Sequence, residues 1–156
     1  MIKTKKGLDL PISGSPSTDI DSSTAINSIA MLGADYVGLK PTMMVDEGDS
    51  VQSGQKLFEN KKNPGTFVTA PSSGIVKSIN RGEKRRFLSL IIETDDSIDP
   101  LTFDLNNYSN SIEFLVDSGA LAYFRTRPYN RMPEPSELPS AIFLSLIHIS
   151  EPTRPY

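Results

Sequence analysis

The chain contains no cysteine, and this absence excludes several kinds of site. A disulfide framework, a zinc site with thiolate ligands and a cysteine-ligated iron–sulfur cluster all require that residue. The chain also lacks any run near the roughly 18 apolar residues of a membrane-spanning helix. Its first residues, Met1–Lys6, precede Gly-Leu-Asp-Leu-Pro and no apolar export segment. We therefore expect a soluble, cytosolic chain that can still lie against a membrane partner.

Positive charge is also scarce. The 16 Lys and Arg residues are outnumbered by 19 Asp and Glu, which gives a formal net charge of −3. Such a chain has no basic excess to neutralise phosphates, so we expect no nucleic-acid partner. With 156 residues, 37% of them hydrophobic, it has room for one globular domain, or for a small domain and part of a second.

Residues 43–93 carry the clearest pattern, in which apolar residues fall at alternate positions between short polar breaks. Alternation with period two predicts strands that bury one face, and the breaks predict tight turns. Two such halves follow one another, which predicts a small sandwich or flattened barrel. The residues expected to form the turns are Gly48, Asp49, Gly54, Pro71, Gly74 and Gly82.

The residues before this region give weaker signals. Residues 8–12 alternate around Pro11 and fit an edge strand, because proline cannot donate to a ladder. Residues 13–23 are rich in Gly, Ser, Pro, Thr and Asp and are expected to form a loop. Residues 25–32 match both helical and strand spacing, and we favour a strand because the segment is short and Gly33 follows it.

The doubled pattern resembles the biotinyl/lipoyl-like barrel-sandwich hybrid fold. Carriers of that family modify one lysine at the tip of the hairpin that joins the halves, where this chain has Lys61 and Lys62. The neighbours typical of a carrier lysine are missing, so we expect solvated lysines without biotin or lipoyl. A carrier domain and a non-redox structural adaptor stay as alternatives; an efflux-type adaptor would need a longer insertion than residues 60–65.

A second resemblance covers most of the chain. Ten sequence blocks, in the same order, are similar to the N-terminal part of the A-type subunits of Na⁺-translocating NADH:quinone reductases. They are residues 5–12, 32–41, 47–49, 54–58, 61–65, 69–71, 79–85, 118–119, 125–128 and 141–143. Blocks 61–65 and 80–85 weigh most, because the general fold does not require them.

This resemblance implies a peripheral subunit of a six-subunit complex on the cytoplasmic face of the bacterial inner membrane. The complex passes electrons from NADH to ubiquinone and exports sodium. Its A-type subunit lies on the quinone-reducing side, where the chief partner is the B-type membrane subunit, with ubiquinone nearby. NAD, FAD, FMN, riboflavin and iron centres would belong to the complex. No cofactor is expected on this chain, which lacks cysteine and a Gly-x-Gly-x-x-Gly phosphate-binding sequence.

The division that follows from this resemblance has three parts. Residues 1–95 would form the barrel-sandwich hybrid domain, and residues 96–143 a linker, a helix and the first strand of a truncated Rossmann-like domain. Residues 144–156 resemble a translated sequencing adapter, so we treat this tail, with the single histidine His148, as non-native. The fragment alone is not expected to be catalytic.

Residues beyond 93 begin with an acidic stretch, 94–100, which predicts a solvated linker and lacks the spacing of a calcium loop. The best helix is 110–118, with Asn110 and Glu113 as a capping pair and Gly119 just past its end. Its apolar face should pack on a missing sheet, so we expect residues from about 94 onward to be loosely packed. In a complete protein, residues 141–143 would begin a buried strand.

Two basic groups are candidate contacts for a partner or an anion, with a local salt bridge or a solvated face as the alternative for each. The first group is Arg81, Lys84 and Arg85, followed by Arg86, and the second is Arg125 and Arg127. No catalytic or metal-binding residue is predicted.

Overall fold

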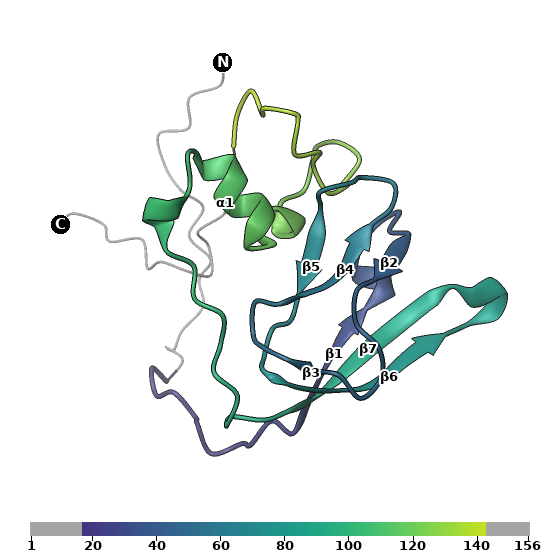
Figure 1. Ribbon diagram of the computed structural model, residues 1–156, viewed down its shortest axis with the longest axis vertical. Coiled ribbons are helices and arrows are strands. Elements are labelled where there is room, and N and C mark those ends of the chain that lie inside the picture. The colour runs from purple at the N-terminus through teal and green to yellow at the C-terminus, as the bar shows by residue number, and fades with distance from the viewer. Residues whose placement is uncertain (1–16, 143–156) are drawn as a thin grey trace, which may run out of the picture.

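Two small antiparallel sheets form the body of the molecule in the computed structural model, which describes residues 17–142 (Figure 1). The four-stranded sheet has the order β1 (Ser28–Leu32), β7 (Phe87–Thr94), β6 (Gly74–Arg81) and β3 (Ser50–Val51). The three-stranded sheet has the order β2 (Pro41–Met43), β4 (Lys56–Asn60) and β5 (Phe67–Thr69). Residues of both sheets enter one buried cluster, so the predicted mainly β sandwich is confirmed.

The core lies between the sheets and consists of the inward residues of the alternating strands. In β7, Leu90 and Ile92 are fully buried, whereas Glu93 is exposed. Phe58 of β4 is also fully buried, and its ring centroid lies 5.2 Å from that of Phe87. Each such side chain contributes about 1.5–3 kcal/mol when it is removed from water. The period-two pattern of residues 43–93 therefore reflects one common core.

Most residues expected at turns lie where the chain changes direction. Gly48 and Gly54 have φ values of +94° and +89°, which side chains rarely tolerate. The Asp49 carboxylate accepts a hydrogen bond from the Asp46 N–H at 2.8 Å. Pro71 lies in the exposed bend between β5 and β6. Gly74 begins β6, where a β-carbon would lie 2.0 Å from the Glu93 carbonyl oxygen, so only glycine permits this close pairing.

The β6–β7 hairpin differs from the expected glycine turn. Gly82 has an extended conformation, with φ −96°, and its N–H donates to the Arg86 carbonyl at 2.8 Å. The left-handed residues are Lys84 and Arg85, with φ values of +54° and +60°. The hydrogen bond at Gly82 closes the hairpin, so the reversal falls on the residues after it. The hairpin projects beyond the body of the sandwich (Figure 1).

The segment before β2 is only partly regular. The strand expected within residues 25–32 forms over Ser28–Leu32 and pairs with β7. Residues 17–23, part of the expected loop, have no regular structure. A short 3₁₀ turn, Gly33–Asp35, connects β1 towards β2. The edge strand predicted at residues 8–12 lies outside the described residues.

Helix α1 (Ser111–Asp117) begins and ends as its caps predict. The Asn110 side chain accepts a hydrogen bond from the Glu113 N–H at 2.9 Å, and the Glu113 carboxylate accepts from the Ser109 N–H at 3.0 Å. Gly119 has φ +73° and lies just past the helix end. Two short 3₁₀ helices flank α1, at Leu105–Asn107 and Ala120–Tyr123.

The expectation of loose packing from residue 94 onward is wrong for a few residues that lie close to the sandwich. Leu121, Ala122 and Met132 are all buried, and the last two belong to the same core cluster as the strands. β7 continues through Thr94, and the Asp95 N–H bonds to the Ser73 carbonyl at 3.0 Å. Ala122 and Met132 are buried because they pack against the sandwich itself. Helix α1, in contrast, has no buried residue, and Leu138 and Ile142 are 80% and 61% exposed.

At the end of the described chain, Ala141 and Ile142 are exposed and form no strand. The strand expected at residues 141–143 refers to a complete domain, so it stays a prediction. Phe143 and the predicted non-native tail, 144–156, lie outside the described residues.

Candidate functional site

The loop between β4 and β5, residues 61–66, contains the two lysines that the sequence analysis compared with a carrier lysine. Lys61 and Lys62 are exposed there, as expected. Gly65 has φ +84°, and its N–H donates to the Glu59 carboxylate at 2.8 Å. The Asn60 side-chain oxygen accepts from the Lys40 N–H at 3.3 Å and the Lys62 N–H at 3.2 Å. These bonds hold the loop in one shape.

The same loop is joined to a distant part of the chain by buried polar contacts, which we call the Asn63 clamp. The Asn63 side-chain amide donates to the Met132 carbonyl at 3.2 Å and to the Pro133 carbonyl at 2.8 Å. The Thr66 hydroxyl also donates to Pro133, at 3.4 Å. Asn63 is 8% exposed and Thr66 is fully buried. The hairpin tip is therefore docked against residues 132–133.

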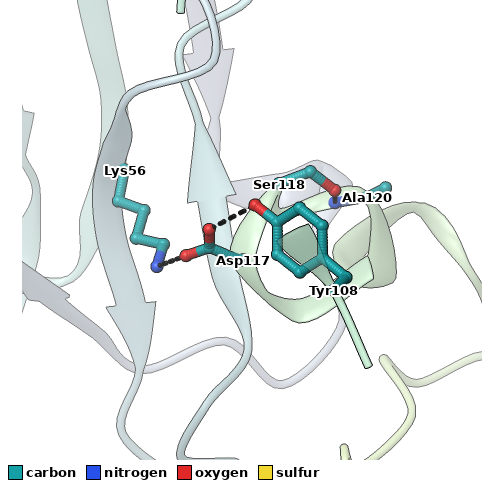
Figure 2. A network of polar contacts seen from close by, with 5 residues as sticks. All are labelled: Lys56, Tyr108, Asp117, Ser118 and Ala120. Carbon is teal, nitrogen blue, oxygen red and sulfur yellow. Dashed lines mark hydrogen bonds and ion pairs between the residues drawn. The ribbon is translucent and has the colours of Figure 1, made fainter. Parts of the chain in front are cut away.

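A second polar contact joins the sandwich to α1 (Figure 2). The Lys56 ammonium, on β4, lies 2.7 Å from the Asp117 carboxylate at the end of α1. The Tyr108 hydroxyl donates to the other Asp117 oxygen at 2.7 Å. Both groups stabilise the ionised carboxylate, so they hold the Asp117 pKa below its usual range. Lys56 also lies 4.4 Å from the centroid of the Phe67 ring.

Close backbone packing completes this junction. A β-carbon at Gly119 would lie 2.4 Å from the Thr69 methyl carbon of β5, so the segment after α1 approaches the sheet as nearly as a glycine allows. Arg125 follows, with its guanidinium 5.8 Å from the centroid of the Tyr36 ring and donating to the Phe124 carbonyl at 2.8 Å. Burial raises the pKa of Tyr36 to about 12.

The two predicted basic groups have different surroundings. Arg125 is half-buried and engaged as described, whereas Arg127 is exposed. Both line an open groove of about 760 Å³, together with Glu134 and Glu137. The lining of this groove therefore combines basic and acidic side chains. The first basic group is exposed on the β6–β7 hairpin and consists of Arg81, Lys84, Arg85 and Arg86. The two ion pairs found within residues 17–142, Lys56–Asp117 and Lys77–Glu93, do not involve this group.

The described part of the chain offers no obvious donor set for a metal. Within residues 17–142, no group of three or more His, Asp or Glu residues is placed to hold a metal ion. None of the described helices is long and apolar enough to cross a membrane. The polar features of the described residues that could serve a function are the Asn63 clamp, the Lys56–Asp117 contact and the basic hairpin.

Comparison with known families decides what kind of domain this is. Residues 2–95 match the family described as the NqrA N-terminal barrel-sandwich hybrid domain. The chain belongs to that family. Residues 109–155 match a further family, the NqrA second alpha/beta domain, so the two NqrA domains occur in order along the chain.

Curated relatives agree with this family assignment. The chain is 46% identical over 153 residues to the A subunit of the Na(+)-translocating NADH-quinone reductase of Yersinia pseudotuberculosis, and equally to that of Tolumonas auensis. The protein of the same name from Photorhabdus laumondii is 45% identical over 152 residues. Each alignment covers 93% of this chain but only 34% of the relative. The chain thus spans about a third of the length of these NqrA-family relatives.

Sequence patterns did not identify the residues that join the two parts of this NqrA-family chain. Asn63 lies in the block 61–65, which was distinctive because the general fold does not require it. The block contributed to the family resemblance. The role of Asn63 is seen only in the folded structure, where its side chain contacts the carbonyls of Met132 and Pro133. Lys56 and Asp117 carried no sequence signal, because 61 residues separate them.

Proposed function

We propose that this chain is the N-terminal part of the A subunit of a Na⁺-translocating NADH:quinone reductase. The observation that supports this most is the identity of 45–46% to proteins of that name across 93% of the chain. Two NqrA domain families in the expected order support it independently of any single relative. The fragment itself is proposed to be non-catalytic.

In this proposal the chain is a peripheral subunit on the cytoplasmic face of the bacterial inner membrane. It would lie at the quinone-reducing side, in contact with the B-type membrane subunit, with ubiquinone nearby. We assign NAD, FAD, FMN, riboflavin and the iron centres to the rest of the complex. The chain has no cysteine to ligate an iron–sulfur cluster, and its described residues supply no cluster of alternative ligands.

The role proposed for the sandwich is to anchor the domain that follows it. Two contacts support this role: the Asn63 clamp holds residues 132–133, and Lys56 holds the end of α1. We keep the division at residues 1–95, 96–143 and 144–156 as part of the proposal. The second family match extends through residue 155, so sequencing the gene across residues 143 and 144 is the test of the proposed non-native tail.

The docked hairpin argues against the carrier alternative. A carrier lysine moves between active sites and needs a hairpin tip free of other contacts. Here the tip residue Asn63 is buried, and its side chain bonds two carbonyls of another segment. Lys61 and Lys62 stay exposed, so a mass increment on either lysine would be the observation in favour of a carrier.

A chimera tests the proposed function. Residues 17–142 would replace the matching part of the Yersinia pseudotuberculosis relative in a strain that lacks its own copy. We expect membranes from this strain to regain Na⁺-stimulated NADH:quinone reductase activity. The matched control replaces the same part with an unrelated barrel-sandwich domain and should give none. Full-length, folded chimera without activity would contradict the proposal.

A further inference from the structure

The tip of the β6–β7 hairpin carries a cluster of exposed basic side chains. Residues 81–86 include four exposed basic side chains and one acidic side chain, a net charge of +3. Because the whole chain carries −3, the remaining residues carry a net −6. This net positive charge lies on a hairpin that projects away from the sandwich (Figure 1).

The backbone fixes the position of these charges. Lys84 and Arg85 both have positive φ, a conformation that costs a residue with a side chain about 1 kcal/mol or more. The Gly82–Arg86 and Arg85–Gly82 backbone hydrogen bonds, at 2.8 and 3.1 Å, hold the reversal closed. The basic side chains consequently extend from a turn whose backbone is held by hydrogen bonds.

A largely apolar cleft lies beside the tip of the same hairpin. It has a volume of about 260 Å³ and is lined by Arg86, Phe87 and Leu88 of the hairpin. The rest of its lining comes from the segment after β1, at Gly33, Ala34, Tyr36, Gly38 and Leu39. Arg86 is the single charged residue in this lining. Leu88 is 41% exposed beside it. Cations and exposed apolar surface thus lie side by side.

We propose that this hairpin and its cleft bind the anionic phospholipid surface of a membrane. The basic side chains would contact the phosphate headgroups, and Leu88 with the cleft would receive apolar parts of the lipid. This inference rests on the proposed function for the nearness of a membrane. The apolar lining favours lipid over an acidic protein surface, because an acidic partner would satisfy the cations but not Leu88. The net negative charge elsewhere would turn the hairpin towards the bilayer.

Vesicle flotation of the 156-residue chain tests this inference. Vesicles would contain phosphatidylcholine alone or with about a third phosphatidylglycerol, at low salt. We expect binding to the anionic vesicles only. Because each basic residue near such a surface strengthens binding by about fivefold, the double variant Lys84→Asn/Arg85→Asn should bind about 25-fold more weakly. Asparagine is the matched replacement, since it tolerates positive φ.

Two further variants separate local contact from general charge. Lys61→Gln/Lys62→Gln removes the same charge from another exposed loop and should leave binding within about twofold of the parent. Leu88→Ser should weaken binding by about fourfold through its exposed apolar surface.

Three results would overturn the inference. The first is no binding of the parent chain to anionic vesicles. The second is an equal loss in the Lys61→Gln/Lys62→Gln control. The third is full binding by Leu88→Ser, together with polyglutamate competing for the chain as well as anionic vesicles do. That result would indicate an acidic protein partner. The chimera assay is independent of all three, so failure of this inference would not be mistaken for failure of the proposed function.

Discussion

Replacing Asn63 with alanine should detach residues 132–133 from the β4–β5 hairpin. The substitution removes two hydrogen bonds, to the Met132 and Pro133 carbonyls, and each contributes about 0.5–1.5 kcal/mol net. Asn63 is only 8% exposed, so water reaches the vacated carbonyls poorly. We therefore expect Asn63→Ala to lower the free energy of unfolding by about 2 kcal/mol.

Asn63→Asp should be worse at neutral pH, because a carboxylate without donors would face two carbonyl oxygens. Burial and this repulsion should raise the pKa of the new carboxyl. A carboxyl whose pKa is raised on folding destabilises the protein at pH values above its unfolded pKa of about 3.9. At lower pH the carboxyl is protonated in both states, and the destabilisation disappears. The aspartate variant should accordingly regain stability, relative to the alanine variant, as the pH falls from neutrality through the raised pKa, and the recovery should be complete below about 4.

Urea unfolding followed by far-ultraviolet circular dichroism measures both effects. Lys62→Ala is the control, since its side chain is exposed on the same loop, and it should change stability by less than about 0.5 kcal/mol. Limited proteolysis should cut the alanine variant faster within residues 126–140. A loss below about 0.5 kcal/mol in Asn63→Ala, with unchanged proteolysis, would refute the clamp.

Three further predictions concern the junction with α1 and the core. Gly119→Ala should destabilise the chain by about 2 kcal/mol, because Gly119 has positive φ and the added methyl group would contact Thr69. In urea unfolding, adding Thr69→Ala to this variant should recover part of the lost stability. Equal losses in the single and the double variant would contradict this explanation. Lys56→Met should cost under about 1 kcal/mol, because the pair with Asp117 is partly exposed. The stability that the Lys56–Asp117 pair contributes should be present above the unfolded carboxyl pKa and be lost as the pH falls through the lowered pKa of Asp117. The free energies of unfolding of the parent and the variant should therefore converge in acid. In absorbance titration, Tyr36 should ionise at about 12, and Tyr36→Phe should remove that late step.

Local patterns predicted much of the fold. The caps of α1 could be predicted because they join residues three or four positions apart, as Asn110 and Glu113 are. The alternating strands could be predicted because burial on one face leaves a period of two in the sequence, as at Leu90 and Ile92. Such features depend on near neighbours and a common core, and both are visible in the chain.

The candidate site depended on contacts that sequence patterns do not show. The Asn63 side chain meets carbonyls 69 and 70 residues away, and backbone carbonyls carry no residue signature. The burial of Ala122 and Met132 against the sandwich was also not expected, because their neighbours in the core lie far away in the sequence. The left-handed tip at Lys84 and Arg85 was missed because glycine at 82 was the stronger local signal.

The central claim is that the β4–β5 hairpin anchors the following domain and does not carry a swinging group. Its most direct test compares two variants of the chimeric protein: Asn63→Asp and Lys61→Ala/Lys62→Ala. The measurement is reductase activity together with the amount of chimera retained in washed membranes. We predict that Asn63→Asp lowers both, whereas the lysine variant keeps near-full activity. Loss of activity in the lysine variant, with a mass increment on Lys61 or Lys62 of the parent, would contradict the claim.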